Sequence, residues 1–147
     1  MKKRVLVLNG PNLNLLGRRD PTHYGSMTME TILEGLRSRF PQIDIEYFQS
    51  NCEGALIDRI HSEGFSEDML GIVLNAGAYT HTSLAIADAI EAVTVPVVEV
   101  HLSNVFAREE IRRRSMIAPV CAGSISGFGA GSYALGIQAL IDRNHED

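Results

Sequence analysis

The stretch Leu70-Gly71-Ile72-Val73-Leu74-Asn75-Ala76-Gly77 decides the fold that we expect for this chain. Its first five residues carry no polar side chain, which predicts a strand that is buried on both faces. The strand ends at an asparagine and a turn. An amphipathic segment capped by Thr80 or Thr82 then predicts a helix that reaches about Ala92. A buried strand that passes into a helix is the repeating unit of a parallel sheet with helical cover.

The same strand–helix unit recurs along the 147 residues. The expected strands cover residues 4–8, 43–48, 70–74, 95–100 and 118–126. The expected helices run from a cap at Thr28 to Pro41, over 53–63 with Gly64 closing the helix, from Thr80 or Thr82 to Ala92, over 107–114 and over 131–142. These units predict an α/β fold, a flavodoxin-like, five-stranded parallel sheet of order 2-1-3-4-5 with helices on both faces. No linker or repeat interrupts the pattern, so we expect one domain over residues 1–147.

Composition and charge argue against several classes of protein. The net charge is -5, whereas a nucleic-acid binder usually carries a basic stripe. No apolar run reaches the roughly 18 residues that a membrane helix needs, and no signal peptide is evident. Cys52 and Cys121 match no metal or redox spacing. We therefore expect a cytoplasmic protein with reduced thiols and no nucleic-acid or membrane partner.

Polar side chains follow the first four predicted strands, at the edge where ligands bind in open α/β sheets. The set comprises residues 9–14, 49–51 and 75–83 after the first three strands, and Glu99, His101, Ser103, Asn104, Arg108 and Arg112 around the end of the fourth. Neutral hydrogen-bonding groups, two histidines and two arginines at one edge suit a small polyhydroxylated anion.

Each of these residues also has a purely structural explanation. Asn and Gly are common turn residues, Thr80 and Ser83 can cap a helix, and His101 with Glu99 can be a buried hydrogen-bonded pair. The convergence of four strand ends at one edge favours a binding site over these separate explanations.

The segment Gly17-Arg18-Arg19-Asp20-Pro21-Thr22-His23-Tyr24-Gly25 exceeds the roughly 2–6 residues of an ordinary connection between a strand and a helix. We expect an active-site lid over about residues 17–26, with Gly17 and Gly25 as hinges. A tyrosine is a poor base at neutral pH because its reference pKa is about 10, but nearby guanidinium groups stabilise the phenolate form. Tyr24 is therefore a candidate base, and the alternative is an exposed loop without a catalytic role.

Residues that the chain lacks restrict the chemistry further. Its only lysines are Lys2 and Lys3, so we expect no buried Schiff-base lysine. The sequence contains no lysine-bearing phosphate loop and no GxGxxG motif that opens a helix. His81 and His101 have no cysteine or carboxylate at metal-ligand spacing. We therefore expect acid–base chemistry without a metal or another cofactor.

Several motifs together resemble the type II dehydroquinase family, and the resemblance runs from about residue 5 to residue 142. The motifs are Leu8-Asn9-Gly10-Pro11-Asn12-Leu13-Asn14, Arg19-x-Pro21-x-x-Tyr24-Gly25, Asn75-Ala76-Gly77-Ala78-Tyr79-Thr80-His81-Thr82-Ser83, Glu99-Val100-His101-Leu102-Ser103-Asn104, Arg108-Glu109-Glu110-x-Arg112 and the glycine-rich segment 123–131. Each motif alone is weak, whereas their order and spacing in a chain of this length are specific.

The resemblance implies 3-dehydroquinate dehydratase activity, the removal of water from 3-dehydroquinate to give 3-dehydroshikimate through an enolate. It places the reaction in the shikimate pathway, which leads to chorismate and the aromatic amino acids, or in quinate breakdown. It also implies a hydro-lyase without a Schiff base or cofactor, assembled as a homododecamer of trimers.

The resemblance further implies roles for individual residues. Tyr24 as tyrosinate is the base, Arg19 keeps it ionised, and Asn12 helps to hold a water that stabilises the enolate. His101 is the general acid that protonates the departing hydroxyl, and Glu99 orients His101. The substrate's hydroxyls and carboxylate are bound by Asn75, His81, Asp88, Arg112 and the backbone at Leu102 and Ser103.

The chain departs from the family pattern at Ala87, at Arg113 and at Asn51-Cys52, which leaves subunit contacts and loop packing open. Two other functions remain: a cofactor-free lyase or isomerase that differs in substrate alone, and a flavodoxin-like module that binds FMN. The FMN module predicts a hydroxyl-rich phosphate loop, where this chain has Asn, Pro and Arg. A purely structural oligomer would leave the loop that carries Arg19 and Tyr24 without a purpose.

Overall fold

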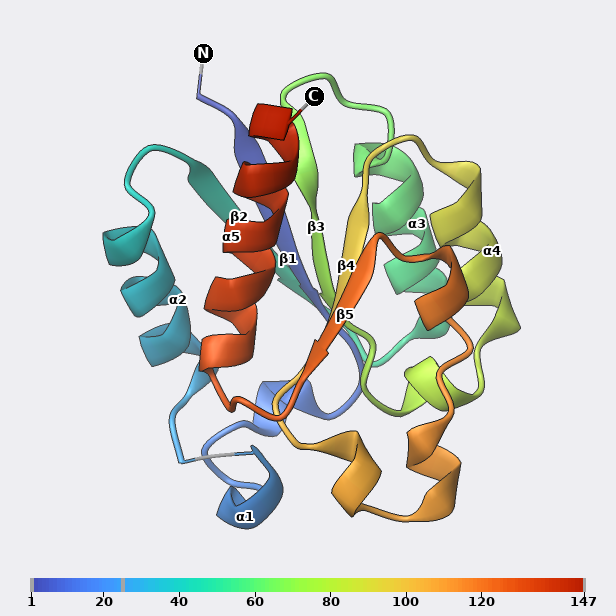
Figure 1. The fold of residues 1–147 in the computed structure, drawn as a ribbon. Helices are drawn as coiled ribbons and strands as arrows, with labels where there is room; N and C mark the ends of the chain where they lie inside the picture. Colours follow the sequence, from blue (N-terminus) through green and yellow to red (C-terminus); the bar gives the residue numbers. More distant parts are fainter. Residues whose placement is uncertain (1, 25, 147) are drawn as a thin grey trace.

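Five parallel strands form one sheet in the part of the chain that the computed structural model describes, residues 2–24 and 26–146 (Figure 1). The strands are β1 (Arg4–Asn9), β2 (Asp44–Gln49), β3 (Met69–Asn75), β4 (Val97–His101) and β5 (Gly123–Ser126). Their order is β2-β1-β3-β4-β5, and each neighbouring pair is parallel. The expected sheet and its strand order are therefore confirmed.

Helices cover both faces of the sheet (Figure 1). They are α2 (Met29–Arg39) and α5 (Gly131–Glu146) on one face, and α3 (Glu53–Glu63) and α4 (Leu84–Ala92) on the other. Strand β1 serves both layers, because Val5 and Val7 belong to the apolar cluster under α2 and α5, while Leu6 and Leu8 belong to the cluster under α3 and α4. All four side chains are fully buried. A strand with both faces covered requires such a continuous apolar run.

Local signals set the ends of α2 and α3. The hydroxyl of Thr28 accepts the N–H of Thr31 and caps α2, as the sequence predicts. Gly64 directly follows α3 and closes it, as the sequence predicts, with a right-handed φ of -70°. Glycine is required there for space, because a Cβ at position 64 would lie 2.3 Å from Cγ1 of Val93.

Two helical predictions need correction. Helix α4 begins after Ser83, whose hydroxyl accepts the N–H of Ile86, because Thr80 and Thr82 lie within and at the end of the 3-10 helix Gly77–His81. Two short 3-10 helices, Val105–Ala107 and Glu110–Arg113, replace the helix that the sequence predicts over residues 107–114. Arg108 and Glu109, which lie between them, adopt extended backbone angles and so interrupt the helix.

The fifth strand is shorter than the sequence predicts. Residues 118–120 form a 3-10 helix with Pro119 in its first turn, and β5 begins only at Gly123. A proline has no N–H to donate and cannot continue the hydrogen-bonding ladder of a sheet. The shortened strand still pairs with β4 and places Ser124 opposite Glu99.

Short helices and loops gather at the carboxyl ends of the strands, where α1 (Pro21–Tyr24) lies (Figure 1). The predicted lid is therefore at the edge of the sheet where a ligand is expected. Gly25, the second predicted hinge, lies outside the described residues. Among the described residues, none of the helices has the length and apolar character needed to cross a bilayer.

Candidate active site

A cavity opens at the carboxyl ends of β1, β3 and β4. Its lining includes every predicted site residue except Glu99 and Asp88, and it adds Arg108. The lining residues come from the turn after β1, the segment that ends in α1, and the segments that follow β3 and β4. Three of the four strand ends that were predicted to converge, those of β1, β3 and β4, thus meet at the cavity, whereas residues 49–51 after β2 do not line it.

His101 and Glu99 form a buried pair at the end of β4. They are two residues apart on one strand, so their side chains point to the same face of the sheet. Nε2 of His101 donates to Oε2 of Glu99 over 2.6 Å, and the two side chains are only 8% and 1% exposed. This bond leaves Nδ1 as the ring nitrogen that can carry a proton to a molecule in the cavity.

Two serines complete the surroundings of Glu99. Oγ of Ser115 donates to Oε2 and Oγ of Ser124 donates to Oε1, each over 2.9 Å. Burial raises the pKa of the Glu99 carboxyl, but the hydrogen bonds from His101, Ser115 and Ser124 outweigh it and hold the pKa below its ordinary value. Glu99 is therefore a buried carboxylate that is ionised at neutral pH and can stabilise a positive charge on His101.

His81 lies against His101 at the cavity wall. The two rings stack with centroids 6.2 Å apart and planes 20° apart. Nδ1 of His81 is 2.7 Å from the carbonyl oxygen of Arg114, which can only accept, so Nδ1 carries the hydrogen. Nε2 of His81 then carries a lone pair and can accept a hydrogen bond from a ligand hydroxyl.

Tyr24 lies close to two guanidinium groups. It is the last residue of α1 and packs, half-buried, against the apolar cluster under α2 and α5. Cζ of Arg19 lies 3.7 Å from the centroid of its ring, and Cζ of Arg108 lies 5.2 Å from it. At these distances both guanidinium groups make cation–π contacts with the ring. The Arg108 side chain is only 10% exposed, so solvent and salt screen its charge weakly.

The turn that carries Asn12 is braced by Asn51. Asn12 has a left-handed φ of 68°, a conformation that asparagine tolerates better than most residues. Its N–H donates to Oδ1 of Asn51 over 3.0 Å, and Nε2 of Gln49 donates to the same oxygen over 3.2 Å. The hydroxyl of Tyr79 donates to the backbone oxygen of Asn51 over 2.7 Å. Asn51, one of the departures from the family pattern, therefore helps to hold the cavity wall.

Polar groups that can bind a ligand line the rest of the cavity. Asn75 ends β3, and its Oδ1 accepts the N–H of Gly77 over 3.2 Å. Nε of Arg112 donates to Glu109 over 3.2 Å, which leaves the other guanidinium N–H groups for an anion. Leu102 and Ser103 follow β4 at the opposite wall, and Oγ of Ser103 accepts from Arg108 over 3.5 Å.

Asp88 is the one predicted site residue that the structure separates from the others. It lies on the exposed face of α4 and does not line the cavity of its own chain. Its neighbour Ala87 is 5% exposed within the apolar cluster under α3 and α4, so its small side chain fits the packing there. Arg113 is exposed and does not line this cavity.

Three residues of the site received no role from the sequence. Arg108 was expected at this edge of the sheet, but its contact with Tyr24 depends on the break between the two 3-10 helices. Ser124 could have been found from the pairing of β4 with β5, which places it opposite Glu99. Ser115 lies in a connecting segment, and no pattern in the sequence marks it as a partner of Glu99.

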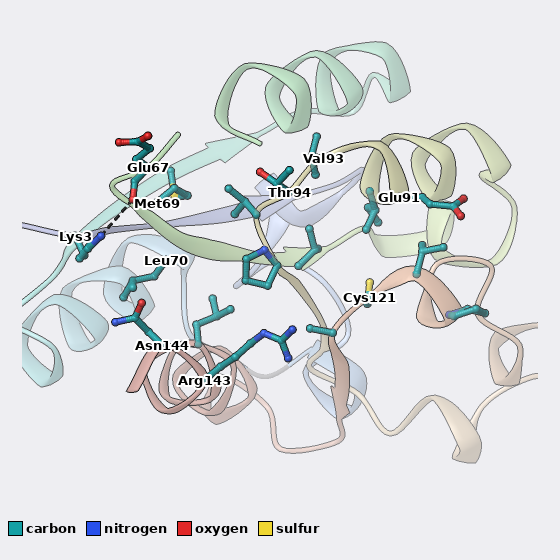
Figure 2. Close-up of a pocket in the computed structure, with 18 residues that line it drawn as sticks. Lys3, Glu67, Met69, Leu70, Glu91, Val93, Thr94, Cys121, Arg143 and Asn144 are labelled. Atoms are coloured by element: carbon teal, nitrogen blue, oxygen red, sulfur yellow. Dashed lines mark hydrogen bonds between the residues drawn. The ribbon is translucent and has the colours of Figure 1, made fainter. Parts of the chain in front are cut away.

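A larger groove lies at the opposite edge of the sheet, lined in part by Lys3, Glu67, Cys121 and Arg143 (Figure 2). It has a volume of about 600 Å³, against about 100 Å³ for the cavity at the carboxyl edge. No histidine or tyrosine lines this groove. Burial raises the pKa of the Cys121 thiol to about 12, so the thiol is protonated and a poor nucleophile at neutral pH. The carboxyl-edge cavity is therefore the better candidate for an active site.

Comparisons with known proteins identify the family of this chain. The family model described as dehydroquinase class II matches residues 3–141. A protein of Pelodictyon phaeoclathratiforme named 3-dehydroquinate dehydratase is 54% identical over 137 residues, which cover 93% of this chain and 91% of the relative. A relative of the same name from Chlorobaculum tepidum is 53% identical over 96% of this chain and 95% of its own length. The crystal structure of type II dehydroquinase from Butyrivibrio crossotus superposes with a TM-score of 0.90 at 44% identity and covers 95% of this chain and 97% of that one. This chain belongs to the class II dehydroquinase family.

Proposed function

We propose that this chain is a 3-dehydroquinate dehydratase that works through an enolate, with Tyr24 as the base and His101 as the acid. One observation carries the proposal. Tyr24, close to two guanidinium groups, and His101, held by a buried carboxylate, line the same cavity. Removing a hydroxyl from the carbon β to a ketone needs a base for the α proton and an acid for the leaving group. The names of the relatives agree with this substrate.

The first step is removal of a proton from the carbon next to the ketone. The phenolate oxygen of Tyr24 takes the proton, and the electron pair of the C–H bond moves to the ketone oxygen to form an enolate. Arg19 and Arg108 favour the phenolate because both guanidinium groups lie at its ring. Asn12, at the cavity wall, is placed to hold a water that donates to the enolate oxygen.

The second step breaks the C–O bond to the β-hydroxyl. An electron pair of the enolate oxygen re-forms the ketone, and the pair of the enolate carbon–carbon double bond forms the new double bond between the α and β carbons. The pair of the C–O bond leaves with the hydroxyl, which takes the proton from Nδ1 of protonated His101 and departs as water. Glu99 stabilises the imidazolium before this transfer through the bond to Nε2. The turnover leaves Tyr24 protonated and His101 neutral, so one proton must pass from the first to the second before the next cycle.

Binding of the substrate uses the remaining polar groups of the cavity. Arg112 offers N–H groups to the carboxylate, together with the backbone at Leu102 and Ser103. Asn75 and Nε2 of His81 bind the hydroxyls. These groups lie on β3, on β4 and in the segments that follow them, so the sheet fixes their spacing.

The wider expectations are part of the same proposal. Residues 17–26 act as a lid that closes over the substrate and excludes water. The protein works in the cytoplasm as a dodecamer of trimers. Asp88 points away from its own cavity, so a substrate contact through Asp88 requires the cavity of a neighbouring subunit.

The experiment that tests the proposal is turnover of 3-dehydroquinate by metal-stripped protein, with and without pretreatment by borohydride. We expect full activity in both samples, because the mechanism uses neither a metal nor an imine. Tyr24→Phe and His101→Ala should each nearly abolish turnover in a folded protein. His61→Ala, on the exposed face of α3, is the matched control and should keep wild-type activity. A folded wild-type protein without activity would overturn the proposal.

A further inference from the structure

A network of buried hydrogen bonds lies behind Asn75, and its members Asn9, Met29 and Tyr133 do not line the cavity. The hydroxyl of Tyr133, on α5, lies 2.8 Å from Oδ1 of Asn9 and 3.2 Å from Nδ2 of Asn75. Nδ2 of Asn9 is 3.4 Å from Sδ of Met29, and Oδ1 of Asn75 is 3.2 Å from the backbone nitrogen of Gly77. Tyr133 and Asn9 are fully buried, and Asn75 is 3% exposed.

The two ends of this hydrogen-bond network fix which group donates and which accepts in every bond of the network. The backbone N–H of Gly77 can only donate, so the oxygen of the Asn75 amide must face it and the NH₂ group must face Tyr133. The thioether of Met29 has no hydrogen to donate, so the NH₂ group of Asn9 must face it and the oxygen must face Tyr133. The reverse arrangement would set two donors against each other at Gly77 and two acceptors against each other at Met29.

Tyr133 joins the two amides of this hydrogen-bond network. Its single hydroxyl hydrogen goes to Asn9, so its oxygen can receive only an N–H from Asn75. Burial raises the pKa of Tyr133 well above its ordinary value, and the hydroxyl therefore keeps the hydrogen that it donates to Asn9. One N–H and one oxygen lone pair of Asn75 remain for a ligand, and their positions are set by this arrangement.

We propose that Tyr133 is a positioning residue that fixes the donor and acceptor sides of the Asn75 amide toward a ligand hydroxyl in the cavity. The identity of the ligand rests on the proposed function, whereas the hydrogen-bond geometry around Asn75 is independent of it. Without the hydroxyl of Tyr133, only the 3.2 Å bond from the N–H of Gly77 holds the Asn75 amide, so the amide is less well oriented and substrate binding weakens. The chemical step, which uses Tyr24 and His101, is not changed.

A double-mutant cycle on steady-state kinetics tests this inference. Tyr133→Phe should raise KM for 3-dehydroquinate about tenfold, the effect of roughly one hydrogen bond, and change kcat by less than about twofold. In an Asn75→Ala background the same substitution should change KM by less than about twofold, because the effect passes through Asn75. Tyr47→Phe removes the hydroxyl on the other side of Asn9, which is 3.5 Å away and does not touch Asn75, and should keep the wild-type KM.

The possible outcomes separate this inference from the proposed function. A folded wild-type protein that does not turn over 3-dehydroquinate would overturn the proposed function. An active wild-type protein with an unchanged KM in Tyr133→Phe, or with the same change in both backgrounds, overturns the positioning role. If Tyr133→Phe fails to fold, neutron diffraction on the deuterated wild-type protein decides instead. Deuterium on the Tyr133 hydroxyl aimed at Asn9, and on Nδ2 of Asn75 aimed at Tyr133, supports the inference, whereas the reverse direction overturns it.

Discussion

Replacing Glu99 by glutamine removes one buried negative charge with little change in shape. The glutamine oxygen can occupy the position of Oε2, where it still accepts from His101 and Ser115. Its NH₂ group then occupies the position of Oε1 and faces the hydroxyl of Ser124, which can accept as well as donate. The variant should therefore fold, and its defect should reflect the lost charge.

The size of the defect follows from the distance between the two charges. Unit charges about 4 Å apart interact by roughly 4 kcal/mol at an effective dielectric constant of about 20. His101 and Glu99 are at least this close, with Nε2 and Oε2 only 2.6 Å apart and both side chains buried. Protonated His101 loses about this much stabilisation in Glu99→Gln, and kcat should fall by about three orders of magnitude at about 1.4 kcal/mol per tenfold.

The assay is kcat for 3-dehydroquinate across a pH series, together with circular dichroism to verify folding. Glu30→Gln, which removes an exposed carboxylate from the first turn of α2, is the matched control and should leave kcat unchanged. A folded Glu99→Gln variant with kcat within about threefold of wild type would refute the electrostatic role given to Glu99.

The same substitution should change the pH dependence of stability. The pKa of Glu99 is lowered in the folded state, so its ionised form stabilises the fold at any pH above the unfolded value of about 4.3. This contribution is lost as the pH falls through the lower folded pKa. The free energy of unfolding of the wild type should thus decrease as the pH falls below about 4.3, and the difference from Glu99→Gln should stay constant from about pH 6 to pH 5 and shrink below about pH 4.3. A difference that stays constant below about pH 4.3 would contradict the pKa shift.

Two further predictions concern the base and the turn after β1. Arg19→Ala should lower kcat/KM, because one of the two cations at the Tyr24 ring is lost, and an unchanged kcat/KM would contradict this. Gly10→Ala should destabilise the fold by about 1–3 kcal/mol in denaturant unfolding, because its Cβ would lie 2.5 Å from the backbone oxygen of Ala76. Gly35→Ala has open space on α2 and should instead stabilise it by about 1 kcal/mol, so equal effects would refute the packing argument.

Most of the sheet was predictable because β1, β3 and β4 are buried at nearly every position, and β2 alternates between polar and apolar residues. β3 is buried at every position, and β4 likewise. β5 has only exposed and half-buried residues, so hydrophobicity could not mark where it starts, and its start was placed five residues too early. The position of Pro119 gave a local reason to doubt a strand there, since proline cannot complete a ladder.

The residues that line the cavity were also predictable, because parallel strands end at the same edge and most of these residues directly follow a strand. The residues that hold these lining residues from behind could not be predicted from the sequence. Ser115 and Tyr133 are distant in sequence from Glu99 and Asn75, and only the packed fold brings them together. Arg108 occupies a position where two 3-10 helices meet, and helical spacing alone could not show its contact with Tyr24.

The chain holds the acid and the base in different ways. His101 is part of β4, and its partner Glu99 is fixed by serines from β5 and from the preceding segment, so the acid belongs to the sheet. Tyr24 ends a four-residue helix and is held by side-chain contacts with two arginines and the edge of an apolar cluster. A substitution that loosens the sheet should therefore impair both functions, whereas one in residues 17–24 should impair proton removal alone. In such a variant we expect the C–H cleavage step to become slower while the His101–Glu99 pair stays intact, because no hydrogen bond of that pair involves the loop.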